Sequence, residues 1–331
     1  MWEVVGQSRV VSLLQRSLEK GSLAHAYLAI GPPHVGKMTL ALDLARAVNC
    51  LAAEPPCGQC DSCQKIASGK HADVQIIGLD SGNLAEIGID QIRQVQHSSN
   101  LPPFEGRHKV FIIDQAELLS TEAANCLLKT LEEPAAGVIF VLLATSGGVL
   151  PATVVSRCQQ LELSPLPTAE VEAVLSQRCG LEQQRAGLLA RLSHGCLGWA
   201  IAAASEERLL KQRAERLEEL HDILSGDYET RFNYVTKLVA WFNQSRGLVQ
   251  EILDLWLDWW RDLLLVKLGS GAITNVDQQS TLIDKARGYR LAQLRAVIGG
   301  IQAAREQLRQ NANPRLVFEV LMLGIPVGGG S

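Results

Sequence analysis

Short apolar runs alternate with helical stretches through the first half of the chain. The pattern predicts five strands, at residues 26–30, 74–78, 110–113, 138–144 and 160–163. Residues 38–48 and 121–132 have the hydrophobic spacing of helices, and Pro134 stops the second of them. The fourth run is fully apolar, as expected of a strand covered on both faces. This alternation predicts an α/β domain with a parallel sheet over residues 1–164.

The pattern changes at about residue 165, after which no strand-like run follows. Short helices are predicted at 169–177 and 184–192, and longer amphipathic helices dominate from about residue 209. Asn313-Pro314 is a good helix start, because asparagine caps free backbone N–H groups and proline fits the first turn. The second half is therefore predicted to be all-α, in two parts, 165–208 and 209–331, with a flexible tail at 328–331.

Composition and charge narrow the class of protein. Hydrophobic residues make up 47% of the 331 residues and charged residues 20%, as in globular proteins. No apolar run reaches the roughly 18 residues needed to span a bilayer, and residues 1–7 do not resemble a secretory signal, so we expect a cytoplasmic protein with no membrane partner. The net charge of −4 argues against DNA binding by this chain alone, since such proteins usually carry a basic surplus.

A glycine-rich segment links the first predicted strand to the next helix. Gly31-Pro32-Pro33-His34-Val35-Gly36-Lys37 has the spacing and the context of a phosphate-binding loop, in which Gly31 and Gly36 shape the turn and Lys37 reaches the terminal phosphates of ATP. The next position should supply a hydroxyl to Mg²⁺, but it is Met38. Thr39 is the nearest hydroxyl and is kept as a candidate, although one residue along a helix is a turn of about 100°. The sequence leaves open whether ATP is bound without hydrolysis.

The third predicted strand ends in an acidic residue, Asp114. An aspartate at this place can hold Mg²⁺ through water, and an acidic residue after it would activate the attacking water. The following residue is Gln115, which cannot accept a proton. The alternative interpretation is a plain strand followed by a helix cap.

Four of the eight cysteines fall within fourteen positions, in the spacing Cys50-x6-Cys57-x2-Cys60-x2-Cys63. Four thiolates complete the tetrahedral coordination of one structural Zn²⁺ and leave no open position for catalysis. A DNA-reading zinc finger is not expected, because the loop carries few basic residues. The other four cysteines are predicted to be small buried apolar residues; they are Cys126, Cys158, Cys179 and Cys196.

Three tryptophans share one helical face. Trp256, Trp259 and Trp260 stand at i, i+3 and i+4. They predict either a core stripe or a subunit interface, where tryptophan is enriched. The sequence does not separate the two.

Further segments complete a resemblance to a known family. They are Val4-Val5-Gly6-Gln7, His25-Ala26-Tyr27-Leu28, Lys129-Thr130-Leu131-Glu132-Glu133-Pro134, Ala144-Thr145-Ser146, Ser156-Arg157-Cys158 and residues 311–323. With the phosphate-binding loop, they resemble the bacterial DNA polymerase III clamp-loader AAA+ family over nearly the whole chain. The resemblance implies a RecA-like domain at 1–164 with a zinc module at about 50–63, a helical lid at 165–208 and a helical collar at 209–331 that joins five subunits in a ring.

The resemblance also implies roles for single residues. Thr145 matches the sensor 1 position, and Arg157 matches an arginine finger that acts in trans on the ATP of the adjacent subunit. The sensor 2 arginine should follow the turn Gly195-Cys196-Leu197-Gly198, but this chain has Trp199 there. This chain thus lacks the expected residue at three catalytic positions, where it has Met38, Gln115 and Trp199, but it keeps the arginine finger. That combination resembles the delta-prime class more than the motor subunits.

The predicted function is therefore that of a delta-prime-like clamp-loader subunit in DNA replication, without ATPase activity of its own, within the DNA polymerase III holoenzyme. Its expected partners are the motor (gamma/tau) and delta subunits and, through the assembly, the sliding clamp and primer–template DNA. The alternatives are an ATP-hydrolysing gamma/tau-type motor subunit, a related branch-migration motor, and a nucleic-acid-binding module that uses the zinc loop.

Overall fold

The computed structural model describes residues 1–79 and 86–326, so the tail predicted at 328–331 lies outside the described residues. The chain forms two compact units. The α/β unit is Met1–Val171 with Ser193–Trp199, and the helical unit is Glu172–Leu192 with Ala200–Ser331. The predicted division into three parts at 164 and 208 stays a prediction.

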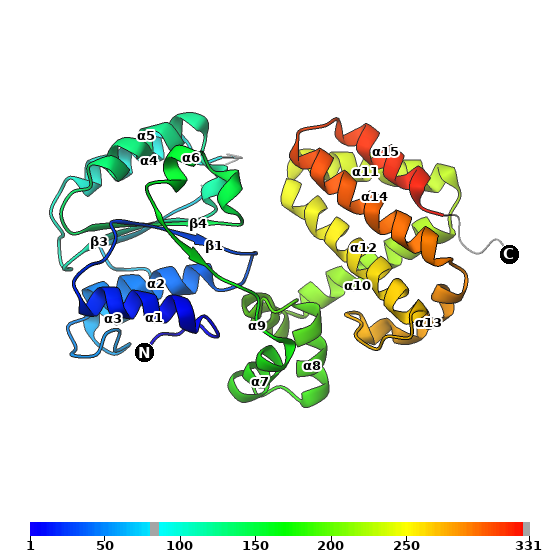
Figure 1. Ribbon diagram of the computed structural model, residues 1–331, viewed down its shortest axis with the longest axis horizontal. Helices are drawn as coiled ribbons and strands as arrows, with labels where there is room; N and C mark the ends of the chain where they lie inside the picture. The colour runs from blue at the N-terminus through cyan, green and yellow to red at the C-terminus, as the bar shows by residue number, and fades with distance from the viewer. Residues whose placement is uncertain (80–85, 327–331) are drawn as a thin grey trace. The chain divides into compact units, whose positions relative to one another are not determined.

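The α/β unit contains a five-stranded parallel sheet (Figure 1). Its strands are β1 (Ala26–Ile30), β2 (Val74–Ile77), β3 (Lys109–Ile113), β4 (Val138–Ala144) and β5 (Gln159–Glu162). Their order across the sheet is β2-β3-β4-β1-β5, and every neighbouring pair is parallel. The five predicted strands are all confirmed, each within one residue at either end.

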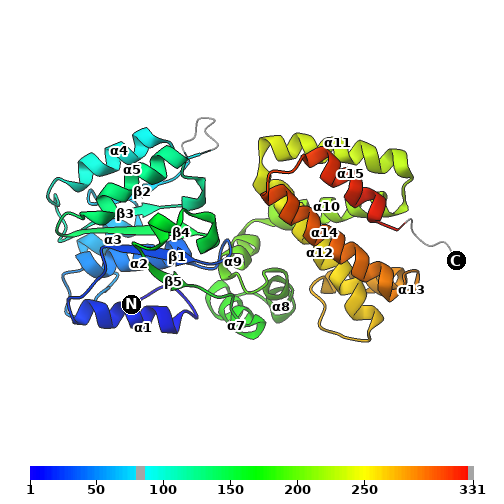
Figure 2. The same cartoon turned by 45° about the horizontal axis from the view of Figure 1, so that its top comes forward.

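Helices cover both faces of this sheet (Figure 1 and Figure 2). They are α1 (Ser8–Glu19), α2 (Lys37–Asn49), α3 (Asp61–Ala67), α4 (Ile89–Ser99), α5 (Thr121–Glu132) and α6 (Ala152–Val155), with the short 3₁₀ turns η1 (Ala116–Leu118) and η2 (Gly147–Val149). Side chains of β1 alternate between two cores: Tyr27 and Ala29 pack with α1 and α2, whereas Ala26 and Leu28 pack with α4 and α5. The strands read as continuous apolar runs because both of their faces are buried.

Beyond residue 165 the described chain is helical. The helices are α7 (Thr168–Cys179), α8 (Gln183–Leu192), α9 (Leu197–Ser205), α10 (Glu207–Ser225), α11 (Tyr228–Gln244), α12 (Arg246–Lys267), η3 (Val276–Gln278), α13 (Gln279–Arg287), α14 (Leu291–Arg309) and α15 (Pro314–Gly324). The predicted start of the last helix is confirmed, since the Asn313 side chain accepts the N–H groups of Arg315 and Leu316. In the described part of the chain, no helix is long and apolar enough to cross a membrane.

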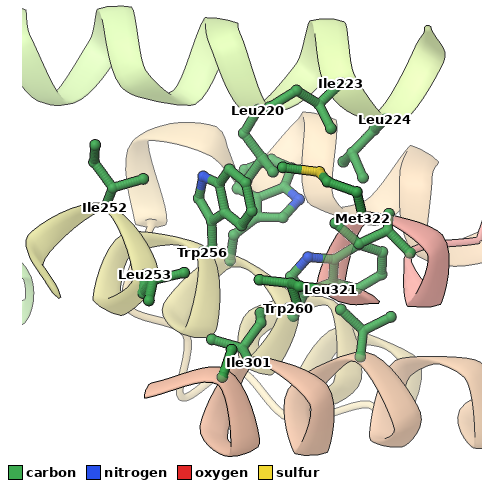
Figure 3. Close-up of a cluster of buried hydrophobic side chains, with 14 of the residues drawn as sticks. Leu220, Ile223, Leu224, Ile252, Leu253, Trp256, Trp260, Ile301, Leu321 and Met322 are labelled. Atoms are coloured by element: carbon green, nitrogen blue, oxygen red, sulfur yellow. The ribbon is translucent and has the colours of Figure 1, made fainter. Parts of the chain in front are cut away.

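The tryptophan face lies in the core of the helical unit (Figure 3). Trp256, Trp259 and Trp260 are each 0% exposed. Trp256 stacks on Tyr234 with ring centroids 5.9 Å apart, and Trp260 meets the edge of Tyr289 at 5.2 Å. The core interpretation is therefore correct for this chain, and these indoles are not available as an exposed interface.

Candidate functional site

The candidate nucleotide site is assembled where three adjacent strands end. Gly31 follows β1, Thr145 follows β4 and Asp114 follows β3, and these strands are neighbours in the sheet. Because the carboxyl ends of parallel strands share one edge, residues far apart in sequence are brought together there. The structure therefore places the phosphate-binding loop, Asp114 and Thr145 at the same edge of the sheet.

The glycines of the loop are required by close approach and by backbone conformation. A Cβ on Gly31 would lie 2.6 Å from the Leu163 carbonyl oxygen, so no side chain fits at this position. Gly36 has a φ of 108°, in the left-handed region. His34, where such loops often have glycine, also has a positive φ of 61°, and its carbonyl oxygen accepts the N–H of Gly198 at 2.9 Å. The turn 195–198 therefore packs directly against the phosphate-binding loop.

Lys37 bonds to its own loop. Its Nζ donates to the carbonyl oxygens of Gly31 at 2.5 Å and Pro32 at 2.8 Å. Burial lowers the pKa of Lys37, while the nearby carboxylates of Glu117 and Asp114 oppose this shift. A phosphate group arriving at the loop would have to compete with these two carbonyl oxygens for the ammonium.

Met38 and Gln115 occupy the two positions at which a hydroxyl and an acidic residue were expected. Met38 packs against the apolar core between α1, α2 and the sheet, where its thioether offers no hydroxyl to a metal. Gln115 is exposed, with a left-handed φ of 51°, and its N–H donates to Asp114 Oδ1 at 3.0 Å. Neither residue supplies the group that ATP hydrolysis needs at that position.

Glu117 is a site residue that sequence reasoning missed. Its Oε1 accepts the N–H of Thr145 at 3.3 Å, and its charge acts on Lys37. The signal was the acidic residue three positions after Asp114, because one turn of η1 brings the side chain back to the strand ends.

The segment before α1 is tied to the sheet by buried polar groups. The Asp43 carboxylate, 0% exposed, accepts the N–H groups of Glu3 at 2.8 Å and Val4 at 2.9 Å. The Gln7 side chain bonds in both directions with the backbone of Ser164. The residues that resemble the family's nucleotide-pocket segment are thus held beside β5 and α2.

Arg157 lies at the opposite edge of the sheet. It precedes β5 by two residues and pairs with Glu132, the last residue of α5, which leads toward β4. These are the amino ends of parallel strands, whereas the phosphate-binding loop lies at the carboxyl ends. Strands of four to seven residues separate the two edges by roughly 13–23 Å, too far for an arginine side chain to reach the loop of its own chain.

The four clustered cysteines are brought together at the far end of α2. Their Sγ atoms all lie within 4.8 Å of one another, and those of Cys50 and Cys60 are 3.9 Å apart. A tetrahedron with Zn–S bonds near 2.3 Å has sulfur atoms about 3.8 Å apart, so the cluster is suited to bind a metal ion such as zinc. Hydrogen bonds from the backbone N–H groups of Cys60 and Gln59 lower the pKa of the Cys57 thiol to about 6, which favours the thiolate that metals require.

The other cysteines follow the prediction only in part. Cys126, Cys158 and Cys196 are half-buried, but Cys179 is exposed at the end of α7, so the prediction of a buried residue is wrong there. The periodicity of this short helix was too weak to assign its last residue to a face.

The sequence of this chain is similar to those of DNA polymerase III subunits. Residues 6–167 match the family described as DNA polymerase III, delta subunit. The DNA polymerase III subunit tau of Bacillus subtilis is 28% identical over 345 residues, which cover 98% of this chain and 61% of that protein. The DNA polymerase III subunit delta' of Bacillus subtilis is 28% identical over 324 residues, 97% of each chain. A solved structure of a DNA polymerase III gamma subunit-related protein from Thermotoga maritima has a TM-score of 0.47 and 19% identity, covering 95% of this chain and 97% of that one.

The sheet order, the phosphate-binding loop after β1 and the acidic residue after β3 define an AAA+ core. With the sequence matches along almost the whole chain, the assignment becomes narrower. The chain belongs to the delta/tau family of DNA polymerase III clamp-loader subunits.

Proposed function

We propose that this chain is the delta-prime-type subunit of the clamp loader, with no effective ATPase activity of its own. The observation that carries the proposal is the contrast between two sites. The nucleotide site has Met38, Gln115 and Trp199 where hydrolysis needs a hydroxyl, an acid and an arginine, whereas Arg157 is present and lies at the edge of the sheet away from that site. An arginine that cannot serve its own loop is suited to act on a neighbour's ATP.

In this proposal Arg157 places its guanidinium on the γ-phosphate of ATP in an adjacent motor subunit. Its fixed positive charge stabilises the charge that develops as the bond to the leaving group breaks. Such a finger contributes on the order of 10³–10⁵ to the rate at the site it serves. Gly31, Gly36, Lys37, Asp114 and Thr145 stay candidates for holding ATP without hydrolysis, with Thr39 as the nearest hydroxyl.

The other regions of the chain are proposed to have the domain roles that the family resemblance implies. Residues 1–164 act as the RecA-like domain, 165–208 as the lid and 209–331 as the collar. Cys50, Cys57, Cys60 and Cys63 hold one structural zinc ion. At the end of α2, whose 13 residues span about 20 Å, that ion is too far from the phosphate-binding loop to take part in hydrolysis.

The partners proposed are the motor (gamma/tau) and delta subunits and, through them, the sliding clamp and primer–template DNA. Support for an assembly role comes from α15, on which Leu316, Val320 and Leu323 are 60%, 68% and 57% exposed. Their spacing of four and three residues places them on one helix face, an apolar surface of the kind that a partner covers.

The test compares wild-type chain with Arg157→Ala, each alone and in a loader reconstituted with motor and delta subunits of the same organism. We expect negligible ATP turnover by either chain alone. In the loader, Arg157→Ala should assemble normally, lower total ATP hydrolysis in part because one site loses its finger, and load clamps poorly on primed DNA. Arg157→Lys should rescue little, since lysine lacks the planar fork.

The second candidate is a gamma/tau-type motor subunit, which the intact Gly31, Gly36 and Lys37 favour. Steady-state turnover by the purified wild-type chain at the level of a motor subunit would establish it and refute the proposal. Wild-type clamp loading by an assembled Arg157→Ala complex would show instead that Arg157 is an ordinary surface residue.

A further inference from the structure

The Arg157 side chain is held by three groups of its own chain, the weakest of them Ser156 Oγ, which accepts from Nη1 at 3.5 Å. One terminal nitrogen, Nη1, donates to the backbone carbonyl oxygen of Thr153 at 2.8 Å. The other, Nη2, forms an ion pair with the carboxylate of Glu132. The arginine side chain is 34% exposed and the glutamate side chain 50%, so both lie at the surface of the α/β unit.

Local helix physics does not account for a glutamate at this position. Glu132 is the last residue of α5, where the carbonyl ends of the helix carry partial negative charge. An acidic side chain is disfavoured there, and a basic one is preferred. The opposing charge of Arg157, 25 residues later in the chain, compensates the carboxylate.

We propose that Glu132 is a positioning residue for Arg157. It fixes the long arginine side chain in one orientation before the neighbouring ATP arrives. A guanidinium has five N–H groups, and the bonds to Thr153, Glu132 and Ser156 use three of them, so two remain for phosphate oxygens. This inference rests on the proposed role of Arg157 and adds a second residue to it.

The energetics favour positioning over restraint. Ion pairs between exposed side chains contribute little, which is too weak to keep a guanidinium away from a γ-phosphate. The same pair is strong enough to select one orientation of a flexible side chain. The conformational entropy of the arginine is then already lost before ATP is hydrolysed, and this loss no longer adds to the barrier. Glu132 should therefore raise the rate at the site that Arg157 serves by about twofold to fivefold.

The experiment uses the complete loader with Glu132→Gln, which keeps the size and helical propensity of the residue and removes its charge. Glu133→Gln is the matched control, because it removes the same charge one position away on an exposed residue. Arg157→Ala and the double variant Glu132→Gln/Arg157→Ala complete a cycle. Thermal unfolding and assembly are measured for each, and ATP hydrolysis is measured over a range of ATP concentrations.

We expect Glu132→Gln to lower kcat for the affected site twofold to fivefold, with KM for ATP unchanged, and Glu133→Gln to behave as wild type. In the double variant Glu132→Gln should have no further effect, because its partner is gone. A structural role would instead lower stability or assembly in both backgrounds.

The outcomes separate this inference from the proposed function. If Arg157→Ala lowers hydrolysis but Glu132→Gln leaves it unchanged or raises it, the positioning role is refuted and the finger stands. An additive loss in the double variant also refutes it. If Arg157→Ala has no effect, the proposed function itself fails.

Discussion

Asp73 is the buried carboxylate that shapes the loop before β3. Its side chain accepts the N–H groups of Phe104 at 2.7 Å, Glu105 at 2.8 Å and Gly106 at 2.7 Å, and the residue is only 2% exposed. Burial by itself raises the pKa of Asp73, but these three hydrogen bonds and the nearby His71 outweigh it, so the pKa lies below its usual range. One ionised side chain thus supplies the hydrogen-bond acceptor for three loop N–H groups that would otherwise be buried without one.

Asp73→Asn should lower the free energy of unfolding by about 1–3 kcal/mol at pH 7, because a neutral amide cannot accept three bonds as a carboxylate does. A group whose pKa is depressed in the folded state stabilises it above the unfolded pKa, near 4, and loses that effect as the pH falls through the folded value. The difference in the free energy of unfolding between wild type and Asp73→Asn should therefore become smaller below about pH 4. Urea unfolding between pH 7 and pH 3 measures it.

Asp90→Asn is the matched control, since that side chain is 84% exposed and its removal should change little at any pH. A difference between wild type and Asp73→Asn that stays constant down to pH 3 would show that the carboxylate charge is not what orders the loop.

At the scale of elements, the connection from α2 to α3 has little apolar surface to hold it. Leu51 is 69% exposed, and from residue 51 to residue 60 only Pro56 is buried. Its sulfur atoms instead converge from both helix ends, with Cys50 closing α2 and Cys60 capping α3. A metal bound by all four would fasten this connection between two helices that also pack together through the buried Ile66 of α3.

Cys60→Ser should reduce the zinc content from one ion per chain to near zero, because three thiolates and a hydroxyl bind Zn²⁺ weakly. The free energy of unfolding should fall by roughly 3 kcal/mol, the linkage expected when free metal is about 100-fold above its Kd. Metal analysis after desalting and denaturant unfolding measure the two effects. Cys179→Ser, at an exposed cysteine outside the cluster, should leave both the zinc content and the free energy of unfolding unchanged. A wild-type protein that contains no metal and has the same free energy of unfolding would rule the site out.

At the scale of the whole molecule, the helical unit combines a fully buried core with one exposed apolar face. Its last helix, α15, is anchored by Arg231, which is 1% exposed and donates to the carbonyl oxygens of Met322 and Ile325 just where the helix ends. The inner residue Leu321 is 4% exposed, while Val320 beside it is 68% exposed. The helix is therefore held in place independently of the face that it turns outward.

Val320→Glu should leave the stability of the isolated chain within about 0.5 kcal/mol of wild type, because the side chain is already in water. In the loader it would bury a charge at the contact, so co-purification with the motor and delta subunits should fall at least tenfold. Leu268→Glu is the control, an apolar residue 61% exposed at the end of α12. Equal assembly of the Val320→Glu chain would show that α15 is not the contact surface.

Local patterns determined much of this protein from the sequence alone. The five strands, α2, α5 and the cap at Asn313 were predicted within about a residue, because hydrophobic period, glycine and proline act over a few neighbouring positions. Other helices were not predicted: α3 has seven residues inside the cysteine loop and α6 has four, whereas α1 and α4 were missed although they are amphipathic. The phosphate-binding loop and the four cysteines could also be identified from the sequence, since their chemistry depends on spacing within one segment.

Only the tertiary structure decided which distant residues meet. The strand order places Asp114 and Thr145 beside the phosphate-binding loop, and it sends Arg157 to the opposite edge with Glu132. The packing of the helical unit buries all three tryptophans, an outcome that helical spacing leaves open because a core and an interface require the same apolar stripe. A side chain's partners across the sheet depend on how the strands are ordered, and this order is set by the burial of both faces at once rather than by any local stretch of sequence.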